Sequence, residues 1–399
     1  MLVQWSMIPT THYLAPMVLD RRRIAVIFCG LCSFIDLWAT QALLPMLADE
    51  LHATPVAVSL TVSMPPLAIA LVAPWTGILA DVLGRKRVIV AAMFCLIVPT
   101  VMVGFSTTLG GIVLWRFLQG LFVPPIFATT VAYIADEFPP DEATGATGLY
   151  VSAGVFGGFL SRFLTAQMAD QFGWRGAFLG LALVTVALAV GTAWLMPRDR
   201  TFVRTATLML SVTQMVAHFR DKRLVATWSI GFCALFTFVT VFTFVAFQLA
   251  APPFGLSTSQ LGMIFFAYLA GVITTPLVGK GVAILGRKNL VLISLAIWAG
   301  GLLLTLLPNL AAIIVGLTVA AAFGFICQAC STSYVAFTAK EGRSSAVGLY
   351  VTFYYLGGAV GGVVAGLAWV IAGWPGCIAA ALIVLAAVAT LVRRYWVDA

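Results

Sequence analysis

Gly148-Leu149-Tyr150-Val151-Ser152 and Gly348-Leu349-Tyr350-Val351-Thr352 are nearly the same stretch of sequence, placed 200 residues apart. The glycine pair and the tryptophan that follow the first stretch, Gly157-Gly158 and Trp174, recur at the same offset. This parallel order predicts two like-oriented halves, each of about 200 residues. In an apolar chain, two parallel halves are typical of a transporter that moves one half against the other.

Composition indicates that lipid, not water, surrounds the chain. Hydrophobic residues make up 62% of the 399 residues and charged residues only 9%, and the mean hydropathy is +1.06. So few charges cannot cover the surface of a water-soluble domain of this length. A spanning helix needs about 20 apolar residues. We therefore predict an all-α membrane protein with twelve transmembrane helices in two pseudo-symmetric six-helix bundles. The predicted spans are 24–45, 56–80, 88–107, 109–135, 144–168, 175–196, 224–249, 259–283, 289–307, 309–338, 345–370 and 374–392.

The basic residues predict how these spans are oriented. Most of the Lys and Arg residues fall in loops on one side, and such loops stay in the cytoplasm. The expected parts are a cytoplasmic segment 1–23, an N-terminal bundle 24–196, a cytoplasmic linker 197–223, a C-terminal bundle 224–392 and a cytoplasmic tail 393–399. Both termini are thus expected in the cytoplasm. The net charge of +8 is explained by topology, and nucleic acid is not expected as a partner.

A repeated loop carries a family resemblance. The segment from Gly77 through Asp81 and Gly84 to Arg85-Lys86-Arg87 resembles the loop 2–3 signature of the major facilitator superfamily, and it recurs in weaker form at 279–288. The segment Leu114-Trp-Arg116-Phe-Leu-Gln119-Gly120 resembles the fourth-helix motif of that superfamily's proton-coupled members. The resemblance implies the twelve-helix fold over the whole chain.

Within the superfamily, the chain is similar to the drug:proton antiporter-1 group and most similar to the YnfM-type inner-membrane permeases, often labelled arabinose efflux. The residues behind this are Tyr150, Arg162, Asp170, Trp174-Arg175 and Tyr354-Tyr355 in their contexts. The resemblance implies a monomer in the bacterial inner membrane that exports a small molecule in exchange for protons. One departure argues against multidrug export, because Gly157-Gly158 replaces the Gly-Pro pair of the drug exporters' fifth helix.

The loop 2–3 residues suggest a conformational latch. Asp81 is an acid in a basic loop, Gly84 permits a tight turn, and Arg85 follows four residues after Asp81. Opposite charges at the membrane surface can hold one conformation and separate in another. The latch set is Gly77, Asp81, Gly84, Arg85, Arg87, Asp136 and Glu137. The alternative is simple anchoring by positive charge. The second copy has Ala283 in place of the acid, so the latch is expected to be asymmetric.

Three charged residues are expected well inside the membrane: Asp36, Arg116 and Arg162. Each costs several kcal/mol there, so such residues usually serve a function. Asp36 is about 18 Å along the first span, with Thr40 expected one turn further on the same face. As the only acid at that depth, it is the expected proton-coupling residue, tuned by Arg116. A structural ion pair between the two is the alternative.

Arg162 shares a stripe of small residues, Gly154, Gly157 and Gly158, that lets helices approach closely. We expect this stripe to form a gate at the junction between the halves. Snorkelling of Arg162 toward the headgroups is the alternative. Uncharged cavity candidates suit a neutral or amphipathic solute, although aromatic packing explains some of them. They are Trp38, Thr40, Gln41, Gln119, Phe127, Tyr133, Tyr268, Gln328, Tyr334, Tyr354 and Tyr355.

Other function classes find less support. The seven cysteines all fall in predicted spans, with no histidine nearby, so packing is expected and no metal or cofactor. An enzyme would need a nucleophile with its base, or metal ligands, at membrane depth, and none is predicted. A receptor would need a signalling domain, and the longest loop has about 27 residues. The leading prediction is proton-coupled efflux of a small organic solute, and the alternative is proton-coupled uptake of an organic anion.

Overall fold

The computed structural model describes residues 20–76, 83–198, 216–339 and 343–396, and all regular elements in these ranges are helical. In the N-terminal half they are α1 (Arg21–Ile35), α2 (Leu44–Glu50), α3 (Pro55–Val72), η1 (Ala73–Trp75), α5 (Arg85–Phe105), α6 (Leu109–Glu137) and α7 (Pro140–Leu195). In the C-terminal half they are α9 (Lys222–Ala250), α10 (Thr258–Ile264), η2 (Phe265–Tyr268), α11 (Leu269–Thr274), η3 (Thr275–Leu277), α12 (Val278–Leu285), α13 (Arg287–Leu304), α14 (Leu310–Thr338) and α15 (Arg343–Tyr395).

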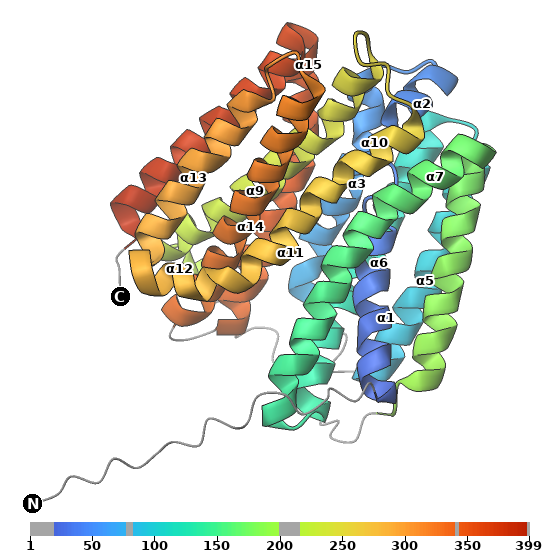
Figure 1. Ribbon diagram of the computed structural model, residues 1–399. Helices are drawn as coiled ribbons and strands as arrows, with labels where there is room; N and C mark the ends of the chain where they lie inside the picture. The colour runs from blue at the N-terminus through green and yellow to red at the C-terminus, as the bar shows by residue number, and fades with distance from the viewer. Residues whose placement is uncertain (1–19, 77–82, 199–215, 340–342, 397–399) are drawn as a thin grey trace, which may run out of the picture.

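These helices provide the twelve predicted spans. Nine ranges of the described chain are long and apolar enough to cross a membrane, and two of them, Gly145–Leu195 and Ser345–Tyr395, have 51 residues. Each of these two folds back on itself at a glycine with positive φ, Gly173 (φ 69°) or Gly373 (φ 59°), so each supplies two arms. α1 supplies the remaining span, although it is shorter than predicted. The all-α fold with two six-helix bundles is thereby confirmed (Figure 1).

Three spans depart from the predicted continuous helix. In the second, α3 is followed by η1. The first ends at Ile35, and residues 36–43 form turns before α2 begins. The eighth is divided into α10, η2, α11, η3 and α12. Pro276 lies at the third break, where a proline cannot donate the backbone hydrogen bond of a regular helix. The other breaks of the eighth span have no such proline.

The sequence repeat is visible in the backbone. Gly84 and Gly286 precede equivalent helices of the two halves and adopt similar positive-φ conformations, φ 91° with ψ 146° and φ 75° with ψ 156°. A residue with a Cβ atom would be strained there, which explains the glycine in both copies. We call the end of the molecule that holds these two glycines and the start of α1 the basic end. The end that holds α2 and Gly173 is the opposite end.

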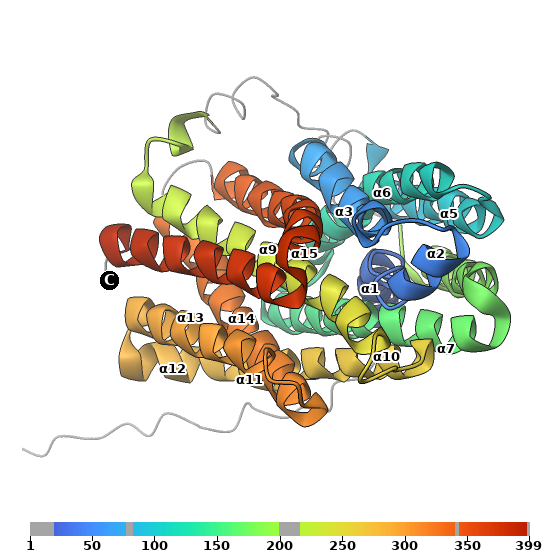
Figure 2. The same cartoon turned by 90° about the horizontal axis from the view of Figure 1, so that it is seen from above.

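The halves pack against each other toward the opposite end. In Figure 1 their helices lie close together there and diverge toward the basic end, and Figure 2 shows the two groups side by side from above. Hydrogen bonds join Ser59 to the carbonyl of Gly362 (3.4 Å) and Ser259 to Gln167 (2.6 Å) across this junction.

A glycine stripe does line this junction, but it belongs to the C-terminal half. Gly358, Gly362 and Gly366 recur every four residues on the first arm of α15, and a Cβ atom built on the last two would lie 1.9 Å from Ser63 and 3.0 Å from Val56 of α3. A Cβ atom on Gly358 would lie 2.8 Å from Leu235 of the same half and 3.4 Å from Pro66 of α3. The spacing places them on one helix face, and their small size allows α3 to approach closely.

Two of the three predicted stripe residues of the N-terminal half, Gly154 and Gly157, pack within that half, whereas a Cβ atom on Gly158 would lie 3.6 Å from Arg162 and 3.7 Å from Trp38. A Cβ atom on Gly157 would lie 2.8 Å from the Leu31 carbonyl, and one on Gly154 would lie 2.9 Å from the Phe34 ring. Both neighbours belong to α1 of the same half. The sequence spacing showed that the glycines share a face, but not which helix that face contacts.

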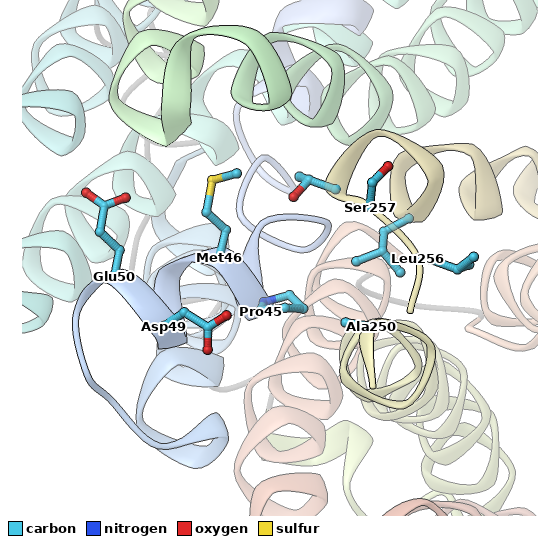
Figure 3. Close-up of a pocket in the computed structure, with 9 residues that line it drawn as sticks. Pro45, Met46, Asp49, Glu50, Ala250, Leu256 and Ser257 are labelled. Carbon is cyan, nitrogen blue, oxygen red and sulfur yellow. The ribbon is translucent and has the colours of Figure 1, made fainter. Parts of the chain in front are cut away.

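An open pocket of about 610 Å³ lies between the halves at the opposite end of the molecule (Figure 3). Residues of α2, including Met46, Asp49 and Glu50, form one wall, and residues that follow α9, including Leu256 and Ser257, form the other. The two walls thus belong to different halves of the molecule.

Candidate functional site

The carboxyl group of Asp36 lies in the interior of the N-terminal half, and the residue is 1% exposed. Its Oδ1 atom accepts a hydrogen bond from the Thr100 hydroxyl of α5, and its Oδ2 atom accepts one from the Thr185 hydroxyl in the second arm of α7, both at 2.9 Å. A buried acid is thus held by two neutral hydroxyl groups from two helices.

Each of these threonines has a second acceptor within reach. The Thr100 hydroxyl lies 2.8 Å from the Leu96 carbonyl, and the Thr185 hydroxyl lies 3.0 Å from the Leu181 carbonyl. A hydroxyl has one hydrogen, so it can donate to only one of its two acceptors at a time. An ionised Asp36 can receive both hydroxyl hydrogens. A neutral Asp36 can donate its own proton to one threonine, whose hydroxyl then turns to its helix carbonyl.

Arg116 of α6 does not form the ion pair with the Asp36 carboxyl group that was the alternative to proton coupling. The guanidinium instead donates to backbone carbonyls: Nη1 to Asp36 at 2.6 Å, Nη2 to Leu37, and Nε to Thr61 at 2.9 Å. The carbonyls of Asp36 and Leu37 are available because α1 ends at Ile35. The last carbonyls of a helix lack partners within it and carry partial negative charge, which a cation stabilises.

A proline explains the third carbonyl. The carbonyl of Thr61 would normally accept from the residue four positions later, which is Pro65, and proline has no N–H. Arg116 and the Thr40 hydroxyl, at 3.3 Å, both use the freed oxygen. Thr40 therefore lies in a turn and binds α3, rather than sharing a helical face with Asp36 as predicted.

Gln119 completes this polar cluster. Its side-chain oxygen accepts from Arg116 at 2.6 Å, and its amide nitrogen donates to the Thr100 hydroxyl at 2.8 Å. Gln119 thereby connects the arginine to a threonine that binds Asp36. Arg116 and Gln119 are 0% and 1% exposed, so the whole cluster is enclosed by protein.

Arg162, on the first arm of α7, lies at the junction between the halves and does not snorkel, since it is 3% exposed. Its Nε atom donates to the Gln41 side-chain oxygen at 2.6 Å, and Nη1 donates to the Gly158 carbonyl. Gln41 in turn donates to the Thr243 hydroxyl of α9 at 3.1 Å, which crosses to the C-terminal half.

Aromatic rings from both halves surround the same guanidinium. The Arg162 carbon Cζ lies 5.0 Å from the Trp38 ring centroid, 5.1 Å from that of Phe265 and 4.6 Å from that of Tyr268. Such distances permit cation–π attraction. The structure thus brings together four predicted residues, Arg162, Gln41, Trp38 and Tyr268.

The other aromatic candidates lie in several places. Tyr334 stacks on Trp396 with ring centroids 4.2 Å apart, and Tyr133 packs edge-on against Phe138 at 6.5 Å, both toward the basic end. Phe127 lies between Phe34 and Tyr150. Tyr354 packs against Tyr355, and Gln328 is partly buried. The positions of Tyr133, Tyr334 and Phe127 fit aromatic packing, whereas Tyr354 interacts electrostatically with Arg162 and Tyr268 and with the Gln328 side chain.

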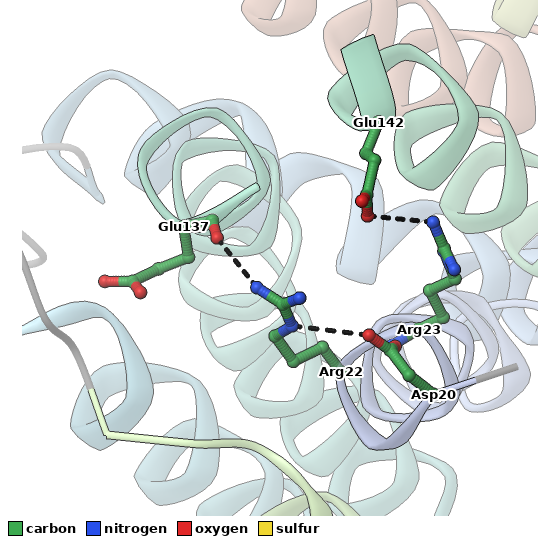
Figure 4. A network of polar contacts seen from close by, with 5 residues as sticks. All are labelled: Asp20, Arg22, Arg23, Glu137 and Glu142. Atoms are coloured by element: carbon green, nitrogen blue, oxygen red, sulfur yellow. Dashed lines mark hydrogen bonds and ion pairs between the residues drawn. The ribbon is translucent and has the colours of Figure 1, made fainter. Parts of the chain in front are cut away.

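Part of the predicted latch lies at the basic end. Arg85 pairs with Asp136 at 3.1 Å, and Arg87 is exposed. Figure 4 shows a neighbouring network, in which Arg22 donates to the Glu137 carbonyl at 3.1 Å and Arg23 pairs with Glu142 at 2.8 Å. All of these contacts join elements of the N-terminal half. Gly77 and Asp81 lie outside the described residues.

Sequence reasoning missed the threonines. The hydroxyls of Thr100 and Thr185 bind Asp36, and that of Thr243 binds Gln41, yet threonine is too common in helices to stand out. Thr61 binds Arg116 through its backbone carbonyl. Pro65 offered the one usable signal, because a proline inside a span frees the carbonyl four residues earlier.

Comparison with known proteins places this arrangement in a family. The sequence pattern of the Major Facilitator Superfamily matches residues 26–251 and again 227–398. The chain belongs to this superfamily. It is 31% identical over 383 residues to the Inner membrane transport protein YnfM of Escherichia coli K12, covering 94% of this chain and 91% of that protein. It is also 28% identical over 357 residues to an uncharacterized transporter of Buchnera aphidicola, covering 89% and 86%.

Solved structures of the superfamily share the fold. A crystal structure of a point mutant of the nucleoside transporter NupG aligns with a TM-score of 0.77 and 16% identity, covering 94% of this chain and all of that one. A bacterial homologue of the human lysosomal transporter Spinster, in an inward-facing occupied conformation, aligns with a TM-score of 0.77 and 15% identity, covering 94% and 96%. The protein is thus a multi-pass membrane transporter of the superfamily, not an enzyme.

Proposed function

We propose that this superfamily member is a secondary active transporter that exports a small organic solute across the bacterial inner membrane in exchange for protons. The observation that carries the proton coupling is the Asp36 site. The Asp36 residue is 1% exposed and lies next to a break in its helix. Its two hydroxyl partners can hydrogen-bond the carboxyl group in either protonation state. Transporters place coupling-ion sites at such interrupted helices near the midplane. The export direction rests on the resemblance to the efflux permeases.

The basic residues support an orientation. We take the basic end as cytoplasmic, because loops rich in Lys and Arg stay inside. Residues 1–23, 197–223 and 393–399 would then be cytoplasmic, and the halves 24–196 and 224–392 would move against each other. With that orientation, the contacts between Ser59 and Gly362 and between Gln167 and Ser259 close the outer side.

Asp36→Asn tests the proposal. An asparagine has the size of the aspartate and can hydrogen-bond both threonines, accepting from one and donating to the other, but it cannot titrate. Everted vesicles are given a panel of sugars, drugs and organic acids, with and without an imposed proton gradient. We expect the variant to retain solute exchange and to lose accumulation driven by the gradient.

The matched control is Asp49→Asn, which neutralises an exposed acid of α2 and should transport like the wild type. Accumulation by Asp36→Asn against the solute gradient, with the wild-type pH profile, would remove Asp36 from the coupling mechanism. A purely structural role for Asp36 has another signature, namely a lower melting temperature with coupling intact.

A further inference from the structure

Arg162 is a buried cation whose present partners are all neutral. No ion pair of the described residues includes Arg162, and its hydrogen bonds go to the Gln41 amide and the Gly158 carbonyl. The other interior cation, Arg116, donates to four oxygen atoms, three of them backbone carbonyls. Arg162 is thus the interior charge with the weaker set of acceptors.

The surroundings of Arg162 match a solute site. It lies where the halves meet, with Trp38 from one half and Phe265 and Tyr268 from the other around its guanidinium. A site between the halves can be exposed to one side and then to the other as they move. Burying a charge without a counter-charge is costly, and ring faces offset only part of that cost, so an anion would be bound favourably.

Resting on the function proposed above, we propose that the transported solute is a small organic anion whose carboxylate binds the guanidinium of Arg162. A carboxylate can accept two parallel hydrogen bonds from one guanidinium, replacing the Gln41 oxygen at Nε. The apolar body of the solute would lie against the rings of Trp38 and Tyr268. The solute would then contact both halves at once.

The anion site and the proton site are separate. The Asp36 carboxyl group binds α5 and the second arm of α7, whereas Gln41 and Trp38 contact Arg162 on the first arm. Asp36, Trp38 and Gln41 all belong to the turns at 36–43, which offer a physical link between the two sites. Binding of the anion can therefore be measured without a proton gradient.

The test measures thermal stabilisation of the purified full-length protein in detergent, since a ligand that binds the folded state raises its melting temperature. The probes are benzoate, hexanoate and succinate, each paired with its neutral amide. We expect at least one anion to stabilise the wild type more than its amide does. Arg162→Gln should weaken the affinity for that anion roughly 10- to 100-fold, the range for losing a charged hydrogen bond.

Two further variants sharpen the test. Arg175→Gln, which removes an exposed arginine that pairs with Glu50, should bind the anion like the wild type. Arg162→Lys keeps the charge but lacks the planar fork, so we expect about a tenfold loss. If Arg162→Gln cannot be purified folded, Arg162→Lys decides the question by the same measurement.

Two results would overturn the proposal: no anion of the panel stabilises the wild type beyond its amide, or anion affinity is unchanged in the Arg162 variants. Failure of the proton-coupled function looks different. Anion binding would still depend on Arg162, but solute accumulation in vesicles would be the same with and without the proton gradient.

Discussion

Gly362→Ala should weaken the closed junction at the opposite end without disturbing either half. A Cβ atom at Gly362 would lie 1.9 Å from the Ser63 hydroxyl oxygen and 3.3 Å from the Ser63 Cβ atom. Ser63 belongs to α3 of the other half, so the clash acts across the junction. The serine side chain can rotate away, but it then loses its hydrogen bond to the Ser59 carbonyl, at 3.3 Å.

The magnitude follows from these two contributions. Losing a hydrogen bond costs about 1 kcal/mol, and overpacking a close contact costs about 1–3 kcal/mol. We expect the contact to be destabilised by about 1–3 kcal/mol in total, because the rotation relieves most of the clash. Each 1.4 kcal/mol changes a ratio of populations about tenfold. The ratio of the closed population to the population without this contact should therefore fall roughly 5- to 150-fold.

The assay measures a distance across the pocket of Figure 3. Spin labels are placed at Asp49→Cys and Ser257→Cys, two exposed positions on opposite walls, with Cys95 replaced because it is the exposed native cysteine. The wild type should give a short, narrow distance distribution. Gly362→Ala should shift population to longer distances.

Two companion variants make the reasoning refutable. Adding Ser63→Ala removes the clashing oxygen and leaves a tight Cβ contact of 3.3 Å, so it should restore most of the wild-type distribution. Gly348→Ala lies on the same helix, where an added Cβ atom meets nothing within 4 Å, so it changes helix propensity alone. The explanation fails if Gly362→Ala gives the wild-type distribution, or if Gly348→Ala shifts it equally.

Three further predictions concern the polar clusters. Arg116→Lys should lower stability by roughly 3 kcal/mol or more, read as a fall in melting temperature, because one ammonium cannot reach the carbonyls of Asp36, Leu37 and Thr61 together. Asp136→Asn should change stability by less than about 1 kcal/mol in the same assay, since its pair with Arg85 is partly exposed. Asp81→Asn should leave the protein inserted but slow transport in vesicles, and wild-type transport would remove this residue from the latch.

The clearest success of sequence reasoning is the repeat. The motif around Gly84 recurs around Gly286, and both glycines adopt positive φ before a helix. Trp174 and Trp374, 200 residues apart, both follow the glycine at which an arm of α7 or α15 ends. Local features of this kind are predictable because the backbone conformation depends on the residue itself.

The polar interior was predicted less completely. The burial of Asp36, Arg116 and Arg162 follows from their depth in apolar spans. The sequence does not show which groups their side chains bind. The partners are hydroxyls and carbonyls of other helices, and every helix carries many of these. The alternative of an ion pair between the side chains of Asp36 and Arg116 is not observed, because the break after Ile35 provides the arginine with two backbone carbonyls instead.

The sequence by itself determined that this protein crosses a membrane twelve times in two similar halves, because hydropathy and the repeat are properties of the chain alone. Only the tertiary structure decided which faces meet. Gly157 and its equivalent Gly357 both pack within their own half, against Leu31 and Phe232, whereas Gly362 and Gly366 face α3 of the other half. These faces are all made of small residues, and the lipid is itself apolar, so hydropathy does not show which face meets the other half. Close packing between particular helices decides which of these faces meets the other half.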